Sequence, residues 1–403
     1  MSDYQVVIHG AGMVGSALAC ALADSDSRIL ILDTRLPLPP DEQVDLRVSA
    51  LSLASQRILR HLGVWEEIAT RHPGAYRDMR VWDAGSRGQI HFASAMVGEP
   101  WLGWIVENRS IQHALLERLR QHPGVEVRCP VSLETLTASH ASLRLGLSDG
   151  VSVTTQLLVG ADGARSRVRE LAGITTTGWS YRQRALVTHV HTECPHRQTA
   201  WQRFLATGPL AFLPLADGRC SIVWSTTEVH AEALLAMDDA TLGEALTVAF
   251  EARLGKVRAG GPRGAFPLAL QHARRYTSPR VALIGDAAHV IHPLAGQGVN
   301  LGLLDAAALA EVLMDAASQG RDPGSPLVLR RFERWRKGHN LAVMATMDGF
   351  KRLFGQTAPP LRGLRGLGLQ LTDRALPLKQ LIIRQAMGLE GDLPRLARDT
   401  IQS

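Results

Sequence analysis

Cysteine and aromatic residues are scarce in this chain of 403 residues. The four cysteines, Cys20, Cys129, Cys194 and Cys220, are scattered without the paired spacing of a zinc site or a redox dithiol, so neither a disulfide framework nor a metal site is expected. Aromatic residues make up 5% of the sequence, and no nucleic-acid-binding motif accompanies them. A nucleic-acid partner is therefore not expected.

Long apolar runs are missing as well. No uninterrupted apolar stretch approaches the roughly 20 residues that a transmembrane helix needs. Residues 1–4 lack the basic and apolar stretches of a signal peptide. We therefore expect a cytoplasmic protein, with any membrane contact peripheral and on the inner face of the membrane.

Positive charge is concentrated near the C-terminus. The net charge is +6, and residues 351–387 contain seven basic residues against one acid, Asp373. Two interpretations remain open: a helix that docks on anionic lipid, or a helix packed on the protein's own core with a solvated basic face. Both interpretations assume a helix, which is indicated by four leucines near helical spacing: Leu361, Leu364, Leu367 and Leu371. Three glycines in the same stretch weaken this helix: Gly363, Gly366 and Gly368.

The first candidate site is a glycine turn near the N-terminus. An apolar run at 5–9 predicts a buried strand, and Gly10, Gly12 and Gly15 follow it before a predicted helix at 17–23. Their spacing lets a backbone turn tightly, approach a pyrophosphate and pack a helix on a strand. Asp33 ends the next predicted strand, where a carboxylate binds ribose hydroxyls. This segment predicts dinucleotide binding without separating FAD from NAD.

A second glycine-rich segment occupies residues 285–305 and follows another buried-strand pattern. Asp286 at the strand end can bind the ribityl hydroxyls of a flavin. Gly296 and Gly298, just before a predicted helix at 299–317, bring bare N–H groups toward the pyrimidine edge of the ring. Between the two segments, another strand ends on the turn Asp162–Gly163 and runs into a helix that bears arginines.

These patterns predict an α/β fold with a Rossmann-like domain that is interrupted by an antiparallel sheet and followed by a helical C-terminus. The expected FAD-binding domain is discontinuous and comprises residues 1–75, 107–175 and 275–345. The expected substrate domain comprises residues 76–106 and 176–274, and the helical C-terminal segment comprises 346–403.

Residues 285–300 are similar to the flavin fingerprint GDxxHxxxPxxGQGxN of class A flavin monooxygenases, and the chain resembles most closely the ubiquinone-biosynthesis hydroxylases. The Asp162–Gly163 turn resembles the Asp–Gly motif of the same flavoprotein hydroxylases. The resemblance covers nearly the whole chain, with further matches at 45–51, 62–65, 106–108, 211–214 and 384–388.

The resemblance implies a p-hydroxybenzoate-hydroxylase-like fold, FAD as cofactor and NAD(P)H as electron donor. It also implies which residues contact FAD: Gly10, Ala11, Gly12, Gly15, Asp33, Arg47, Asn108, Asp162, Asp286, Pro293, Gly296, Gln297, Gly298, Val299 and Asn300.

The implied activity is hydroxylation of the aromatic ring of a polyprenylated phenol in ubiquinone biosynthesis, with O₂ as co-substrate and a flavin C4a-hydroperoxide as the reactive species. The signals for ring position conflict. Residues 221–225 and 383–389 resemble the C5 hydroxylase, whereas 201–204 and 264–267 resemble the C6 hydroxylase. We predict C5, with C6 and C1 as alternatives.

His292 is the candidate catalytic residue, because it precedes Pro293 on the expected flavin face. It either orients or deprotonates the phenol or is a structural loop histidine. Two other functional hypotheses remain: a flavin-dependent lipid reductase or oxidase that does not incorporate oxygen, and a non-enzymatic component of a biosynthetic complex. A ubiquinone-biosynthesis complex is an expected partner in either enzymatic case.

Overall fold

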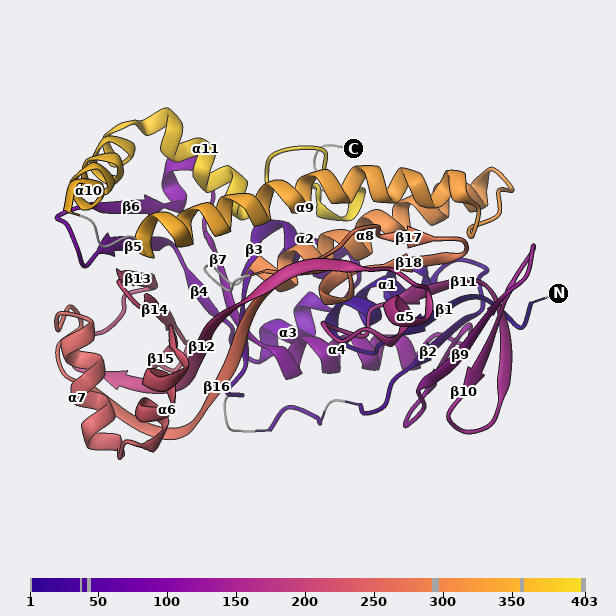
Figure 1. Cartoon of the computed structure of the whole chain (residues 1–403), viewed down its shortest axis with the longest axis horizontal. Helices are drawn as coiled ribbons and strands as arrows, with labels where there is room; N and C mark the ends of the chain where they lie inside the picture. Colours follow the sequence, from indigo (N-terminus) through magenta and orange to yellow (C-terminus); the bar gives the residue numbers. More distant parts are fainter. Residues whose placement is uncertain (1, 37, 42–44, 292–296, 356–358, 400–403) are drawn as a thin grey trace.

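The structure is a computed structural model, and it describes residues 2–36, 38–41, 45–291, 297–355 and 359–399. Its main elements are a mostly parallel sheet, a separate antiparallel sheet and a group of C-terminal helices (Figure 1). The α/β fold class predicted from the sequence is confirmed. The residue boundaries of the two predicted domains remain a prediction.

The parallel sheet holds the glycine turn. Its parallel strands lie in the order β8 (Val125–Arg128), β2 (Ile29–Leu32), β1 (Tyr4–His9), β11 (Ser152–Gly160) and β18 (Val281–Leu283). β2 is buried along its whole length, because both faces of the sheet are covered and its side chains are continuously apolar. The neighbouring antiparallel strands are β17 (Thr277–Ser278), β9 (Leu133–Ala138) and β10 (Leu143–Leu147).

Helices on this sheet bury its apolar strands. α1 (Met13–Ala23) packs against α4 (Asn108–Arg120) and against the long helix α8 (Gln297–Ser318). Gly302 permits this approach, because a Cβ atom there would lie 2.6 Å from a methyl group of Val14 on α1. The remaining helices around the sheet are α2 (Leu53–His61), α3 (Trp65–Thr70) and α5 (Arg167–Leu171).

The second large sheet is antiparallel except for one parallel pair, β13 with β5. Two strands of 17 residues each, β12 (Thr176–Thr192) and β16 (Val257–Ala273), run from the parallel sheet into it as a continuous ribbon (Figure 1). The other strands are β19 (His289–Val290), β15 (Cys220–Thr227), β14 (Gly208–Pro214), β13 (Thr199–Leu205), β5 (Asp78–Asp83) and β6 (Gln89–Ala93). Their core includes Trp82, Phe212 and Phe250, packed beneath α6 (Glu228–Ala236) and α7 (Asp239–Ala249).

A small three-stranded sheet lies between the two large ones. Its order is β3 (Val48–Ser52), β7 (Gly103–Glu107) and β4 (Gly74–Tyr76). β3 directly precedes α2, and β7 directly precedes α4. The start of β3 therefore borders both the nucleotide-binding half and the antiparallel half of the molecule.

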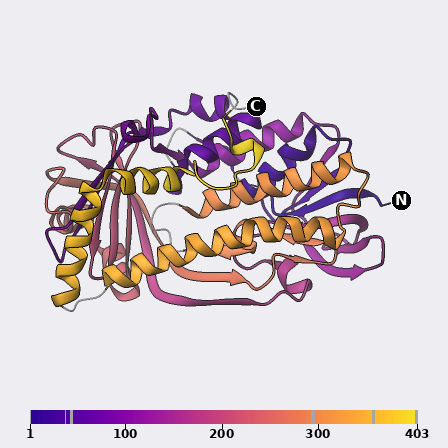
Figure 2. The same cartoon turned by 90° about the horizontal axis from the view of Figure 1, so that it is seen from above.

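The C-terminal part is helical, as predicted. α9 (Pro326–Gly355) runs along one side of the molecule, and α10 (Pro359–Arg374) and α11 (Leu376–Met387) cover the outer end of the antiparallel sheet (Figure 2). The glycines of α10 do not prevent the helix, since Gly366 packs closely on the β5–β6 turn, where a Cβ at Gly88 would lie 2.7 Å from Gly366 Cα. No helix among the described residues is both long and apolar enough to span a bilayer.

Candidate functional site

The three sequence segments converge on one cleft. The cleft has a volume of about 470 Å³ and is lined by Gly12, Gly163, Asp286 and Gly298, one or two residues from each segment. Arg47 and Asn108, which precede β3 and begin α4, line the same cleft. Residues as far apart in the sequence as 12 and 298 therefore share one cavity, as the prediction of a single extended cofactor requires.

The glycine turn has the backbone geometry that its spacing predicts. Gly10 has φ = +117°, and a Cβ atom there would lie 2.3 Å from the carbonyl oxygen of Ala161. A Cβ atom at Gly15 would lie 2.0 Å from the carbonyl oxygen of Gly10, so α1 packs directly on the turn. Gly12, by contrast, has no atom nearer than 4.0 Å to a built Cβ. Its open face is where a ligand can approach the backbone.

Asp33 closes the turn from the neighbouring strand. Its Oδ2 accepts a hydrogen bond of 2.6 Å from the backbone N–H of Ala11, and its Oδ1 accepts one of 3.0 Å from Arg35 N–H. Ala11 is itself 1% exposed, so it contributes its backbone to the turn and packs its side chain into the core. The carboxylate is thereby fixed beside the glycine turn.

The carboxylate of Asp162 accepts hydrogen bonds from the start of the next helix and does not face the cleft. Its Oδ2 accepts hydrogen bonds from the backbone N–H groups of Arg167 (2.7 Å) and Val168 (3.1 Å). His9 Nδ1 lies 3.0 Å from the same oxygen. Burial alone would raise the pKa of Asp162, but hydrogen bonds from His9 and Ser166 outweigh it and lower the pKa.

His9 therefore has a definite partner. It joins the glycine-turn strand to the Asp162 turn. Arg169 makes a second link that the sequence did not reveal. Its guanidinium donates to the carbonyl oxygens of Ala287 (2.9 Å) and Ala164 (2.7 Å), which ties the Asp162 segment to the Asp286 segment.

Asp286 projects from the short turn after β18 into the cleft. Its side chain is accessible to solvent there, but the surrounding protein replaces much of the bulk water and raises its pKa, while His289 and Arg47 act in the opposite direction. Gly298 in the first turn of α8 has no atom within 4 Å of a built Cβ. This helix end therefore presents open backbone N–H groups to the cleft.

Beneath this turn lies a buried network centred on Asp305 of α8. Asp305 is fully buried and accepts hydrogen bonds from Gly285 N–H (3.2 Å), His289 Nε2 (2.5 Å), Arg336 Nε (2.9 Å) and Asn340 Nδ2 (3.0 Å). Burial would raise its pKa, but His289 and Arg336 hold the pKa far below the ordinary range. Arg336 and Asn340 could not be recognised from the sequence, because both lie on α9, outside every motif described above.

Arg47 and Asn108 are held at the side of the cleft. The Arg47 guanidinium lies over the ring of Phe266, with 5.4 Å between its Cζ and the ring centroid. Asn108 Oδ1 accepts a hydrogen bond of 2.6 Å from Ser49 Oγ. Asn300 behaves differently, because its Oδ1 accepts from Ser52 N–H (2.9 Å) and Ser55 Oγ (2.7 Å) while its side chain is 2% exposed. Asn300 thus connects α8 to β3 and α2.

The remaining predicted site residues are found in the sequence between 292 and 299. Val299 lines the cleft, and Gln297 is the first residue of the helix. His292, Pro293 and Gly296 lie outside the described residues. Within the described ranges, no group of three histidine, cysteine or acidic side chains is arranged to hold a metal ion.

A second cavity adjoins the cleft. It has a volume of about 190 Å³ and shares Val48 and Val223 with the cleft. Its lining is mostly apolar and comes from the antiparallel sheet, β3 and one face of α11, where Ile382, Ile383, Ala386 and Met387 contribute. The contribution of α11 was missed from the sequence, because only the tertiary fold brings residues 382–387 beside residues 48–52.

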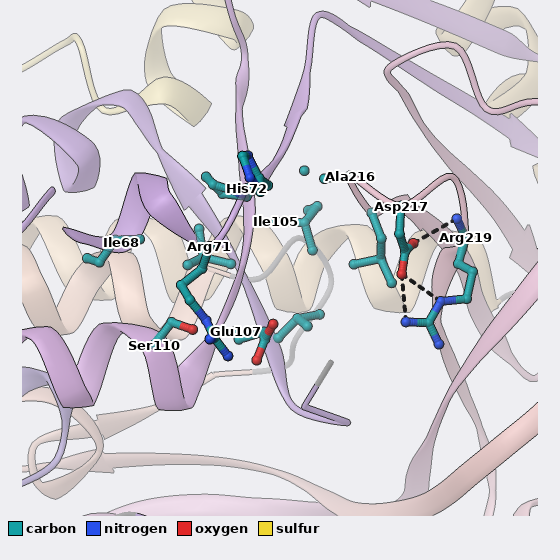
Figure 3. Close-up of a pocket in the computed structure, with 14 residues that line it drawn as sticks. Ile68, Arg71, His72, Ile105, Glu107, Ser110, Ala216, Asp217 and Arg219 are labelled. Carbon is teal, nitrogen blue, oxygen red and sulfur yellow. Dashed lines mark hydrogen bonds and ion pairs between the residues drawn. The ribbon is translucent and has the colours of Figure 1, made fainter. Parts of the chain in front are cut away.

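A third cavity, of about 370 Å³, is lined by charged side chains (Figure 3). Arg71 and Glu107 come from the α3–β7 side, and Asp217 and Arg219, joined by hydrogen bonds of 2.7 and 3.0 Å, come from the β14–β15 turn. Burial raises the pKa of Glu107. None of the predicted cofactor residues within the described ranges lines this cavity, although it shares Val48 with the cleft.

The cleft and the glycine turn beside it fit FAD. A carboxylate fixed at the end of β2 suits ribose hydroxyls, an open glycine at the start of α1 suits phosphate, and a second carboxylate with an open helix end suits the ribityl chain and ring. A side chain at Gly12 or Gly298 would project into the space that such a ligand needs. The chain therefore provides a cradle of backbone donors and two carboxylates for one extended cofactor.

Comparison with known proteins agrees with this geometry. The family model described as "FAD binding domain" matches residues 3–342. The 3-demethoxyubiquinol 3-hydroxylase of Escherichia coli (strain K12) is 40% identical over 387 residues, covering 96% of this chain and 98% of that protein. Ubiquinone hydroxylase UbiL of Rhodospirillum rubrum is 41% identical over 397 residues, covering 98% of this chain and 92% of that protein.

Solved structures agree in fold. The crystal structure of p-nitrophenol 4-monooxygenase PnpA from Pseudomonas putida DLL-E4 superposes with a TM-score of 0.76, covering 95% of this chain and 98% of that one, at 18% sequence identity. The fold and the matched family define an FAD-dependent monooxygenase with a p-hydroxybenzoate-hydroxylase-like architecture. The chain belongs to the FAD binding domain family and, within it, to the ubiquinone-biosynthesis hydroxylases.

Proposed function

We propose that this protein hydroxylates the aromatic ring of a polyprenylated phenol in ubiquinone biosynthesis, at ring position C5, with NAD(P)H as the electron donor. The observation that carries the proposal is the apolar cavity that adjoins the cofactor cleft at Val48 and Val223. Bound flavin supplies the activation of O₂. A phenol ring seated in this cavity borders the cleft, and an apolar lining suits a lipid-linked substrate.

In this proposal each of the predicted site residues, in the cleft or in the turns beside it, contacts or supports one part of the cofactor. Gly10, Ala11, Gly12 and Gly15 receive the pyrophosphate, and Asp33 accepts from the ribose hydroxyls. Asp286 and the first turn of α8, with Gln297, Gly298 and Val299, receive the ribityl chain and the ring. Arg47 and Asn108 line the cofactor, while Asp162 and Asn300 hold the surrounding turns in place. Pro293 and Gly296 retain their predicted roles.

The protein's own contribution to the chemistry is position and the exclusion of water. Among the described residues that line the second cavity, none carries a carboxylate, an imidazole or an amine. Burial raises the pKa of Tyr76, which lines this cavity, to about 12, so its hydroxyl keeps its proton at neutral pH. Tyr76 can therefore donate a hydrogen bond to a substrate oxygen. His292 remains the candidate for proton transfer.

The test of this function uses labelled dioxygen. Purified holoenzyme supplied with NADPH and a prenylated phenol under ¹⁸O₂ should yield a product that carries one ¹⁸O atom, measured by mass spectrometry. A product without label would contradict a monooxygenase and favour the lipid reductase or oxidase. A protein that binds no flavin even with added FAD would favour a non-enzymatic component of a complex.

A second candidate substrate rests on one observation. The Escherichia coli relative that is 40% identical carries the name 3-demethoxyubiquinol 3-hydroxylase, which specifies a demethoxylated quinol as its substrate. The two candidate substrates are distinguished by which intermediate accumulates in a strain that lacks this protein. Accumulation of a phenol without the C5 oxygen supports our proposal, and accumulation of 3-demethoxyubiquinol replaces it with the second candidate. Co-purification from the wild-type strain tests the predicted ubiquinone-biosynthesis complex.

Filling the second cavity should impair substrate binding and leave the flavin in place. Ala386 on α11 lines the cavity, so Ala386→Phe places a ring in the space that the phenol needs. We expect kcat/KM for a prenylated phenol to fall about tenfold or more, about 1.4 kcal/mol in the transition state, with unchanged flavin absorbance. Ala345→Phe on the exposed side of α9 is the matched control and should retain full activity. Equal losses in both variants would contradict the cavity assignment.

A further inference from the structure

The outward faces of α10 and α11 are unusually apolar for a solvated surface. On α10, Leu367 and Leu371 lie one helical turn apart and are 52% and 56% exposed. On α11, Leu378 and Leu381 lie one turn apart and are 45% and 53% exposed, and Leu376 at the helix start is 51% exposed. Both helices lie at the outer end of the molecule (Figures 1 and 2). We call these five leucines the outer leucine face.

The charges around this face are mostly positive. Arg374 ends α10 and Arg384 lies near the end of α11, and both are exposed. The acid between the helices, Asp373, is occupied, because its Oδ1 accepts from Lys379 Nζ (2.9 Å) and from His91 N–H (3.0 Å). Arg365 turns inward to a buried ion pair with Asp83. The basic surplus predicted from the sequence is thus partly internal. Arg374 and Arg384 are exposed on the same two helices as the leucines, and Arg384 Nε lies 4.0 Å from a carboxylate oxygen of Glu390.

α11 contributes both to this face and to the proposed substrate cavity. Its residues Ile382, Ile383, Ala386 and Met387 line the cavity. Ala386 both lines the cavity and is exposed to solvent, so the cavity reaches the surface at the edge of α11. The cavity and part of the outer leucine face are therefore formed by the same helix.

We propose that the outer leucine face docks on the surface of an anionic lipid bilayer, and that the prenyl chain of the substrate passes from the bilayer along the edge of α11 into the cavity. The occupant is a bilayer because apolar side chains flanked by arginines match the boundary between acyl chains and anionic headgroups. The proposal rests on the proposed function, which supplies a substrate with a lipid tail.

The test measures co-sedimentation of the full-length holoenzyme with vesicles. Binding is expected for vesicles of phosphatidylcholine with phosphatidylglycerol, and much less for phosphatidylcholine alone. The double variant Leu371→Glu/Leu381→Glu should reduce the bound fraction about tenfold or more, since two apolar contacts are replaced by charges that anionic lipid repels. The matched control is Val229→Glu/Val248→Glu on α6 and α7, where the valines are 79% and 71% exposed. It should bind vesicles like the parent.

A substrate comparison separates this proposal from the proposed function. The leucine variant should keep its rate on a short, water-soluble phenol and lose rate on a long-chain phenol embedded in anionic vesicles. Unchanged vesicle binding by the leucine variant, or equal loss in the valine control, would overturn the docking surface while hydroxylation stands. Vesicle binding without hydroxylation of either phenol would overturn the proposed function while the docking surface stands. If the leucine variant loses a co-purifying protein but still binds vesicles, the outer leucine face is a binding surface for a protein partner and not for a bilayer.

Discussion

FAD is expected to leave the Asp305→Asn variant at least about tenfold faster than it leaves the parent enzyme. Asp305 holds the backbone N–H of Gly285 and the ring of His289, the residues on either side of the cleft carboxylate Asp286. Without the charge, the turn that carries Asp286 loses its fixed position, and a displacement of a fraction of an ångström weakens contacts to a bound group by an order of magnitude. Dissociation is measured from flavin fluorescence after dilution of the holoenzyme.

The same substitution should lower stability. It leaves the buried guanidinium of Arg336 without its carboxylate, and breaking a buried pair in this way typically costs about 3–5 kcal/mol. The folded-state pKa of Asp305 lies below its unfolded value, so the pair's contribution is fully present above about pH 4 and is lost as the pH falls toward the folded pKa. Thermal unfolding of both proteins at neutral pH measures the loss.

A second buried pair provides the control. Asp83 and Arg365 are 2.8 Å apart, both are nearly inaccessible, and neither lines the cofactor cleft. Asp83→Asn should therefore lower stability by a similar amount and leave the FAD dissociation rate unchanged, compared at a temperature well below both unfolding midpoints. If FAD leaves both variants equally fast, Asp305 acts only through global stability and not by positioning the Asp286 turn.

Gly298→Leu should abolish FAD binding without unfolding the protein. No atom lies within 4 Å of a Cβ built at Gly298, so the protein itself has room for the side chain, but that room is the cleft. Leucine also has a higher helix propensity than glycine. We expect FAD affinity to fall by about a hundredfold or more, about 2.7 kcal/mol, with the far-ultraviolet circular dichroism unchanged.

The matched control for this variant is Gly338→Leu. Gly338 lies within α9, is exposed and also has open space around a built Cβ. This variant should bind FAD like the parent, because its new side chain points away from the cleft. If Gly298→Leu binds FAD normally, the cofactor does not occupy the space beside Gly298. The start of α8 would then not be part of the FAD site.

The local parts of the site were predictable from the sequence because their chemistry is encoded in adjacent residues. The positive φ of Gly10, the carboxylate at the end of β2 and the open glycine in α8 each follow from residue type and spacing. The parallel order of β1, β2 and β11 follows from buried apolar runs and their crossovers.

The rest depends on contacts that the sequence does not display. β16 contains Gly260, Gly261 and Pro262, which indicate a turn when read alone. In the structure they interrupt the ladder with β12 between the pairs Val190–Ala259 and Thr188–Arg263, and pairing resumes on both sides. α10 forms despite its glycines because Gly366 provides close contact with Gly88. The partners of Asp305 on α9 lie 31 and 35 residues away in the chain, so no local pattern could indicate them.

The ribbon of β12 and β16 also bears on how the cofactor site can open. Its register shifts between Ser180 and Gln183, where Arg182 has φ = +52°. A paired ribbon resists stretching and bends most readily where its ladder is interrupted. Ala185 and Val187, just beyond this interruption, line the cofactor cleft. Because Ala185 and Val187 lie on the ribbon that runs between the two large sheets (Figure 1), a change in the angle between these sheets would move the wall of the cofactor cleft.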